Sequence, residues 1–274
     1  MFEEIIVNQV LQGYSFPLLD YFFQAITYFG NPILWVVIGA WLFWLGKEKK
    51  SFMIISIALF ATVVSGVLKY IIARPRPVGL RILETQITPL SMPSGHATLA
   101  GTIYTFIEKK VYPKEKILLL ILVILTAVSR LYLGVHYLSD VLVGLLLGYI
   151  LGKILLRVEK KVEKSHLKIT KFKEEYLLVI LFIVIAGLIL FLPSEFNAAY
   201  ALIGYYIGFV IYRDSKFTIK TENKKLNLLF GTIILGIIAF FAHISTGLLS
   251  QALFLLAGIF ITLIWPIVLN KTRL

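Results

Sequence analysis

Long runs of apolar, uncharged residues recur along this chain and restrict its possible folds more than any other feature. Hydrophobic residues make up 59% of the 274 residues, and the mean hydropathy is +0.88. A soluble domain of this size could not bury so much apolar surface, whereas a helix of about 20 apolar residues crosses a membrane with its backbone groups satisfied. The sequence therefore predicts an all-α protein, a polytopic transmembrane helical bundle.

The apolar runs predict about nine spans, separated by polar segments. An amphipathic stretch at residues 2–19 precedes them and suits a helix that lies at the membrane interface. The first span is expected to be broken near Asn31 and Pro32, and the third is short. The expected spans cover approximately residues 21–46, 51–72, 94–107, 116–133, 137–156, 176–192, 197–212, 226–242 and 249–269.

Glycines at a regular spacing mark one face of the fifth expected span. Gly144, Gly148 and Gly152 lie one helical turn apart. Because glycine has no side chain, this face is predicted to let a neighbouring helix approach closely.

The basic residues of the connecting segments predict the orientation of the chain. Segments 47–50, 108–116, 153–175 and 213–225, together with the C-terminal tail, hold 22 of the 27 lysines and arginines. Cytoplasmic segments of membrane proteins are enriched in these residues, so we expect this side to face the cytoplasm. The chain would then be integral to the cytoplasmic membrane, with an outer N-terminus and a cytoplasmic C-terminus.

The remaining five basic residues fall together on the outer side. They are Lys69, Arg74, Arg76, Arg81 and Arg130. Since charged residues are costly near hydrocarbon, their grouping predicts an anionic ligand on the outer face. The net charge of +12 follows the topology, and no nucleic-acid partner is expected.

Three segments near these cations also carry histidines, serines and a carboxylate. They are Lys69–Pro77, Pro93–His96 and Ser129–Asp140. In the third, His136 and Asp140 are four residues apart, which on a helix would put both side chains on one face. A carboxylate in that position can hold one imidazole nitrogen and leave the other free to react.

The other polar groups of these segments suit a phosphate. Arg76 and Arg130 offer paired donors, and Lys69 offers a point charge. The backbone N–H groups of Ser94 and Gly95 would stand at a helix N-terminus, where phosphate binds readily. This combination fits phosphoryl transfer, because cations and N–H groups stabilise the charge that develops on the phosphoryl oxygens.

Together the three segments resemble the three-part signature of the type 2 phosphatidic acid phosphatase superfamily. The matching positions are Lys69-x6-Arg76-Pro77, Pro93-Ser94-Gly95-His96 and Ser129-Arg130-x5-His136-x3-Asp140. This family includes membrane lipid phosphatases, glucose-6-phosphatase and the vanadium haloperoxidases. The resemblance covers residues 69–140 and does not reach the last four expected spans.

The resemblance implies a role for each motif residue. His136 would be the nucleophile that forms a phosphohistidine, with Asp140 fixing its tautomer. His96 would protonate the leaving oxygen and then activate water. The phosphate would be bound by Lys69, Arg76, Ser94, Gly95 and Arg130. No metal or other cofactor is expected, since the sequence shows no carboxylate cluster to hold one.

The resemblance also implies how the chain is divided. Residues 1–156 would form a phosphatase core from the interfacial helix and five spans, and the charged segment 157–175 would be a cytoplasmic linker. Residues 176–274 would add four spans, the first of which would complete a six-helix-type core.

Five further ionisable residues lie outside the motifs. Arg74 and Arg81 could contact a diphosphate or a lipid headgroup, and a solvated loop position explains them equally well. Glu84 fits a loop carboxylate better than a site residue. His166 falls in the predicted cytoplasmic linker, and His243 ends the eighth expected span, where a structural role fits better.

The sequence thus predicts an integral membrane lipid phosphatase with its site on the extracytoplasmic side. The substrate would be a lipid phosphate or diphosphate monoester, with undecaprenyl diphosphate, phosphatidylglycerophosphate and phosphatidate as candidates in that order. The same phosphohistidine could pass its phosphoryl group to another lipid, which would make the protein a phosphotransferase. A transporter or flippase is a third hypothesis, although the last four expected spans lack internal charges. Membrane lipids are the other expected partners, and the sequence carries no signal for an oligomeric state.

Overall fold

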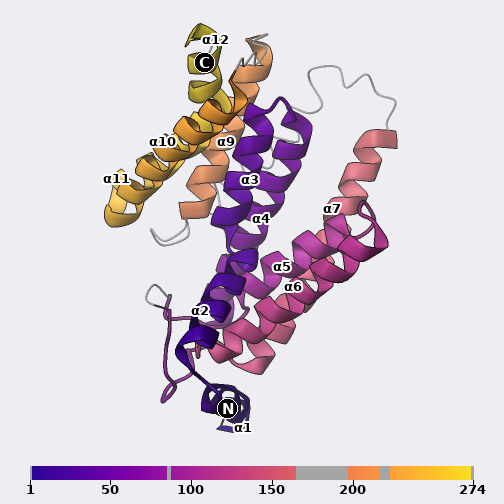
Figure 1. Cartoon of the computed structure of the whole chain (residues 1–274), viewed down its shortest axis with the longest axis vertical. Helices are drawn as coiled ribbons and strands as arrows, with labels where there is room; N and C mark the ends of the chain where they lie inside the picture. The colour runs from indigo at the N-terminus through magenta and orange to yellow at the C-terminus, as the bar shows by residue number, and fades with distance from the viewer. Residues whose placement is uncertain (1, 85–87, 165–196, 216–222, 273–274) are drawn as a thin grey trace. The chain divides into compact units, whose positions relative to one another are not determined.

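A computed structural model of the chain describes residues 2–84, 88–164, 197–215 and 223–272. These residues form helices joined by turns and loops, without a β-strand, as the all-α prediction requires (Figure 1). The helices of the N-terminal half are α1 (Phe2–Gly13), α2 (Pro17–Ile26), the 3-10 helix η1 (Thr27–Gly30), α3 (Pro32–Trp44), α4 (Glu48–Ile72), α5 (Gly95–Ile107) and α6 (Pro113–Tyr132). Those that follow are α7 (Leu138–Lys164), α9 (Asn197–Asp214), α10 (Lys224–Ile244), α11 (Gly247–Ile259), the π-helical turn η2 (Phe260–Ile264) and α12 (Trp265–Thr272).

Four helices in the described part of the chain are long and apolar enough to cross a membrane. They are Glu48–Ile72, Leu138–Arg157, Lys224–Ile244 and the continuous helix Gly247–Lys271. A fifth is obtained if α2 and η1 form one broken span with α3, since the two parts meet at an angle of 56°. Asn31 between them has an extended backbone and Pro32 begins α3, so the predicted break is confirmed.

The count of nine spans goes beyond these helices and stays a prediction. The expected span at 176–192 lies outside the described residues. Helix α5, which corresponds to the third expected span, has 13 residues. At 1.5 Å per residue it is about 20 Å long, shorter than a hydrocarbon core of about 30 Å, and the short third helix is confirmed.

The N-terminal stretch at residues 2–19 belongs to two helices. Helix α1 ends at Gly13, and Pro17 stands at the first position of α2, where its fixed φ and missing N–H fit. The apolar side chains Val7 and Leu11 of α1 pack against a buried cluster formed by Ala97, Ala127, Leu131 and Val141. Helix α1 therefore contacts the helices that carry the predicted motifs.

The helices divide into two compact units, of which the first comprises Met1–Leu34 and Ala61–Ser165. Within this unit α7 lies directly against α5. A Cβ added to Gly148 would stand 2.4 Å from the backbone oxygen of Thr98, and one added to Gly144 would stand 2.7 Å from that of Ser94. The close approach predicted from the glycine spacing is confirmed, and it holds the beginning of α5 against α7.

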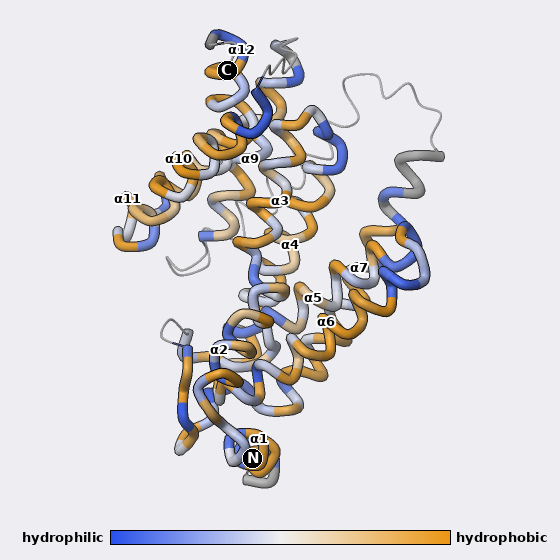
Figure 2. Tube along the Cα trace, in the orientation of Figure 1, coloured by the Kyte–Doolittle hydropathy of each residue, from blue (hydrophilic) through white to orange (hydrophobic). Residues whose placement is uncertain are grey.

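The second unit comprises Trp35–Phe60 and His166–Leu274. Its core is aromatic: the ring of Phe43 in α3 lies 5.1 Å from that of Tyr212 in α9, and Trp44 lies 6.2 Å from Trp265, measured between centroids. Figure 2 shows hydrophobic residues along much of α3, α10 and α11. Residues 35–60 thus pack with helices from the end of the chain, a grouping that the sequence does not reveal.

Candidate active site

The segment between α6 and α7 places the central histidine. Helix α6 ends at Tyr132 and α7 begins at Leu138, so His136 lies in the connecting turn and Asp140 lies in the first turn of α7. The turn requires a glycine, because Gly134 has a φ of +76° and a Cβ there would lie 2.5 Å from the backbone oxygen of Arg81. The expectation that His136 and Asp140 share one helix face is wrong, although the turn still brings them together.

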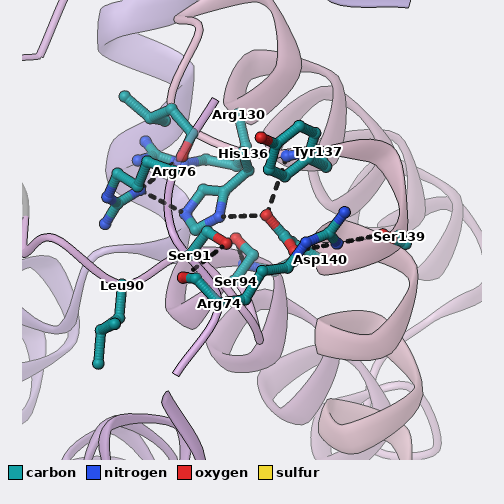
Figure 3. Close-up of polar contacts among 12 residues, drawn as sticks. Arg74, Arg76, Leu90, Ser91, Ser94, Arg130, His136, Tyr137, Ser139 and Asp140 are labelled. Atoms are coloured by element: carbon teal, nitrogen blue, oxygen red, sulfur yellow. Dashed lines mark hydrogen bonds and ion pairs between the residues drawn. The ribbon is translucent and has the colours of Figure 1, made fainter. Parts of the chain in front are cut away.

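His136 and Asp140 form a buried pair. The distance from His136 Nδ1 to Asp140 Oδ2 is 3.4 Å, and the side chains are 2% and 0% exposed. The carboxylate also accepts a hydrogen bond of 2.9 Å from the backbone N–H of Tyr137 and one of 2.8 Å from Arg74. Figure 3 shows the imidazole between Arg76 on one side and Asp140 on the other. Asp140 is thus fixed from two directions and faces one ring nitrogen.

The other ring nitrogen of His136 faces Arg76. The distance from Arg76 Nη1 to His136 Nε2 is 3.3 Å, and the same Nη1 donates to the backbone oxygen of Val135 at 2.6 Å. Since a guanidinium has no acceptor, Nε2 is the acceptor of this contact, and the ring proton belongs on Nδ1 beside Asp140. This is the tautomer in which Nε2 has a lone pair available for reaction.

The electrostatic surroundings favour the neutral imidazole. Burial and the positive charges of Arg130 and Lys69 hold the pKa of His136 well below its usual range. Burial and the charge of Arg130 also lower the pKa of Arg76, to about 10, which leaves this guanidinium charged at neutral pH. The site therefore places an uncharged histidine beside a charged guanidinium.

Lys69 and Arg76 hold the irregular loop that follows α4. Lys69 lies in the last turn of α4 and donates to the backbone oxygens of Leu90 at 3.1 Å and Ser91 at 2.7 Å. Arg76 Nε donates to the backbone oxygen of Thr88 at 2.5 Å. Both cations thus reach the loop segment that leads into the second motif.

The second motif begins α5. Ser94 is its N-cap and accepts from the backbone N–H of Ala97 at 3.5 Å, while its own N–H donates to the backbone oxygen of Asp140 at 3.0 Å. The Ser94 N–H predicted for phosphate is therefore engaged within the chain. His96 follows in the first turn, and its Nε2 is a buried atom without a hydrogen-bond partner in the described structure. A buried polar atom without a hydrogen-bond partner indicates a position where a ligand or a proton acceptor can bind.

Arg130 is the most deeply buried cation of the site. Its residue is 1% exposed, Nη1 donates to Thr27 at 2.6 Å, and Nη2 forms an ion pair with Glu84. Its Nε is buried without a hydrogen-bond partner among the described residues. A guanidinium with a free donor suits an oxyanion that binds in place of, or beside, Glu84.

Two of these contacts involve residues that the sequence does not single out as site residues. Arg74 donates to Asp140, and Glu84 pairs with Arg130. Arg81 instead forms an ion pair with Asp20, and His243 is exposed at the end of α10. His166 lies outside the described residues. The signal for Arg74 is its place in the Arg-Pro-Arg-Pro sequence, but an irregular loop gives no periodicity from which its direction could be predicted.

Comparisons with known proteins find similar proteins in one family. Residues 50–164 match the family model of the PAP2 superfamily. The chain is 30% identical over 124 residues to an undecaprenyl-diphosphatase of Sulfolobus acidocaldarius. The aligned region covers 43% of this chain and 60% of that protein. It is 29% identical over 147 residues to phosphatidylglycerophosphatase B of Bacillus subtilis. This alignment covers 47% of this chain and 69% of that protein.

A solved structure shows the same kind of fold. The crystal structure of a transmembrane PAP2 type phosphatidylglycerolphosphate phosphatase from Bacillus subtilis has a TM-score of 0.51 and 25% sequence identity to this chain. The superposition covers 60% of this chain and 88% of the chain in the crystal structure. The segment matched by the family contains all three motifs and leaves the C-terminal helices uncovered. Over residues 50–164, which contain all three motifs, this chain is thus similar to the PAP2 superfamily.

Proposed function

We propose that this protein is an integral membrane lipid phosphatase that hydrolyses a phosphate or diphosphate monoester of a lipid through a phosphohistidine. The observation that carries the proposal is the environment of His136. Its Nε2 is the unprotonated ring nitrogen and lies 3.3 Å from Arg76, while Asp140 faces Nδ1. A nucleophile beside a guanidinium and opposite an orienting carboxylate is the arrangement that phosphoryl transfer to an imidazole requires.

In the first step the lipid phosphate binds among Lys69, Arg76 and Arg130. Nε2 of His136 attacks phosphorus, and the bond between phosphorus and the lipid oxygen breaks as the nitrogen–phosphorus bond forms. His96 donates a proton to the departing oxygen, which leaves as an alcohol or as a lipid monophosphate. Positive charge that develops on the imidazole is stabilised by Asp140, which faces the Nδ1 proton.

In the second step water attacks the phosphorus of the phosphohistidine. His96, now unprotonated, accepts a proton from this water, and the nitrogen–phosphorus bond breaks. Inorganic phosphate leaves, and both histidines return to their starting protonation states. The cations stabilise the phosphoryl oxygens in both steps, because the charge on these oxygens changes while their positions hardly move.

The relatives support a lipid substrate and narrow its class. One is an undecaprenyl-diphosphatase and the other a phosphatidylglycerophosphatase, so their names cover a prenyl diphosphate and a glycerolipid phosphate. We place undecaprenyl diphosphate first, then phosphatidylglycerophosphate and phosphatidate. Residues 1–156 are proposed as the phosphatase core and residues 176–274 as four additional spans, after the charged segment 157–175.

The distribution of basic residues supports an extracytoplasmic site and a cytoplasmic C-terminus. Since the chain has no cysteine, single cysteines can test this orientation without background labelling. Val78, in the loop beside the site, and Tyr112, in a segment predicted to be cytoplasmic, are 78% and 77% exposed. An impermeant thiol reagent added to intact cells should label Val78→Cys and not Tyr112→Cys. The reverse pattern would place the site on the cytoplasmic side.

The central test is phosphate release by the purified full-length protein from each of the three lipids, without added divalent metal. The His136→Ala variant should lose activity by roughly 10⁴-fold or more, while His243→Ala, an exposed histidine of α10, should not differ from the original protein. Because the pKa of His136 is lowered, activity should persist as the pH falls to about 6.5 and decline only below that value. Equal activity in His136→Ala would exclude the mechanism.

A donor lipid with a labelled phosphate tests the alternative function. Transfer of the label to a second lipid would identify the protein as a phosphotransferase instead. Both reactions share the phosphohistidine, so the test separates them by the acceptor alone.

A further inference from the structure

Helix α1 carries a line of polar side chains that the proposed mechanism does not use. Glu4, Asn8 and Gln12 are each four residues apart, so they lie on one face of the helix. All three side chains form hydrogen bonds with the chain between residues 131 and 139, the segment that contains His136. A helix far away in the sequence thus contacts the segment of the nucleophile at three successive turns.

Asn8 binds the backbone of the nucleophile itself. Its Nδ2 donates to the backbone oxygen of His136 at 2.9 Å and to that of Leu131 at 2.8 Å, and the residue is fully buried. The two carbonyl groups belong to the end of α6 and to the turn that follows it. One amide therefore fixes the position of His136 relative to the helix that carries Arg130.

Gln12 fixes the same turn from the loop side. Its Nε2 donates to the backbone oxygens of Arg81 at 2.7 Å and Tyr132 at 2.9 Å, and its Oε1 accepts from the N–H of Arg81 at 3.1 Å. A Cβ on Gly134 would stand 2.9 Å from this Nε2, so the turn leaves room for the amide. Gln12 thus joins the turn of His136 to the loop between α4 and α5.

Glu4 is linked to the carboxylate of Asp140 through Ser139 and Arg74. It accepts hydrogen bonds from the N–H of Ser139 at 3.1 Å and from its hydroxyl at 2.6 Å. It also pairs at 3.0 Å with Arg74, whose Nη1 donates to Asp140. Burial raises the pKa of Glu4, but the hydrogen bonds from Ser139 and Arg74 outweigh this effect and lower it, so Glu4 is charged at neutral pH.

We propose that Glu4, Asn8 and Gln12 are positioning residues that hold the His136 turn in the geometry needed for attack on phosphorus. The role rests on the proposed phosphatase function, since it concerns the position of that nucleophile. Reacting groups must be placed to within a fraction of an ångström, and a shift of about 1 Å costs roughly 100-fold in rate. A helix that served only the stability of the fold would not need to bond the carbonyl of the nucleophile.

The test compares two substitutions on the same helix. Asn8→Leu removes both donors at nearly constant size, and Gln9→Leu makes a similar change at the exposed neighbouring residue. With the lipid that the original protein hydrolyses best, Asn8→Leu should lower kcat by roughly 100-fold and change KM by less than about threefold. Gln9→Leu should change neither constant. A loss of stability alone would lower the amount of active protein, and with it the apparent kcat, at unchanged KM. Active protein is therefore quantified in each sample, and kcat is calculated per active molecule.

A second measurement does not depend on turnover. Amide hydrogen exchange of the full-length protein in detergent should become faster in residues 131–139 of Asn8→Leu, and stay unchanged there in Gln9→Leu. Unchanged exchange or unchanged kcat in Asn8→Leu would overturn the positioning role while leaving the phosphatase proposal intact. An original protein that releases no phosphate from any of the lipids would overturn the phosphatase proposal, whatever the exchange rates show.

Discussion

The two units of this protein both bury hydroxyl and amide side chains, but the first also buries arginine, histidine and aspartate. In the described part of the chain, the buried arginine, histidine and aspartate are Arg130, His136 and Asp140, all in the first unit. The second unit buries hydroxyl and amide groups, such as Ser51, whose Oγ lies 3.1 Å from the hydroxyl of Tyr205. Neutral groups of this kind join helices in a membrane at modest cost.

The difference separates neutral polar groups that join helices from the ionisable groups of the candidate site. A buried hydroxyl pair forms one hydrogen bond and carries no charge with which to hold an anionic ligand. The first unit buries charged and reactive groups in addition to hydroxyl and amide groups, and among the described residues Arg130 Nε and His96 Nε2 have no hydrogen-bond partner. In the second unit the buried atoms without a partner include Asn197 Oδ1 and Trp265 Nε1, which are neutral. Ionisable groups at membrane depth are expensive, so a cluster of them with unused donors indicates a site.

The largest effect should come from removing the charge that orients His136. Asp140→Asn keeps the shape of the side chain but permits the wrong imidazole tautomer, and activity should fall by roughly 10⁴-fold, as for an equivalent change in a serine–histidine–aspartate triad. Ser51→Ala in the second unit removes a buried hydrogen bond and should cost only about 1 kcal/mol of stability, without affecting kcat. Phosphate release and thermal unfolding measured on both variants would check this contrast. A similar loss of activity in both would break the distinction between the units.

A smaller effect is expected on stability from two glycines, one in each unit. Gly148→Ala in α7 would bring a Cβ to 2.4 Å from the backbone oxygen of Thr98, and overpacking of this kind costs about 1–3 kcal/mol. Gly236→Ala in α10 meets nothing within 4 Å and should stabilise its helix by about 0.5–1 kcal/mol. Thermal unfolding in the same detergent would compare them. Equal stability of the two variants would contradict the close packing of α5 and α7.

The sequence predicts those parts of the site that depend on neighbouring residues. The spacing within Lys69–Pro77, Pro93–His96 and Ser129–Asp140 indicated which groups would share a phosphate, and the structure brings Arg76, His136 and Asp140 into contact. The glycine spacing in α7 predicted the helix contact because a helix repeats every 3.6 residues. Helical periodicity and the residue types within a motif can both be recognised from the sequence alone.

Contacts made through irregular segments could not be predicted in this way. Glu4 meets Arg74 because α1 packs beside the turn before α7, and no periodic pattern connects residues 70 positions apart. The sequence likewise suggested one helix for His136 and Asp140, whereas the turn that contains Gly134 places His136 before the start of α7. The roles of these residues in catalysis stay predictions until the variants are measured.

The smallest expected effect concerns Glu84 and tests whether this carboxylate competes with phosphate for Arg130 in the first unit. Glu84 pairs with Arg130, and its side chain is 26% exposed, so a substrate phosphate would compete with it for the same guanidinium. Glu84→Gln removes the competing charge and should tighten inhibition by inorganic phosphate by about fivefold, which corresponds to the roughly 1 kcal/mol of a partly exposed ion pair. Inhibition constants for phosphate at constant ionic strength would measure the change, with Glu48→Gln, whose carboxylate accepts from Tyr212 in the second unit, as the control. Weaker inhibition in Glu84→Gln would instead mean that this carboxylate orients Arg130 for the ligand, since the guanidinium would then bind phosphate less well without its partner.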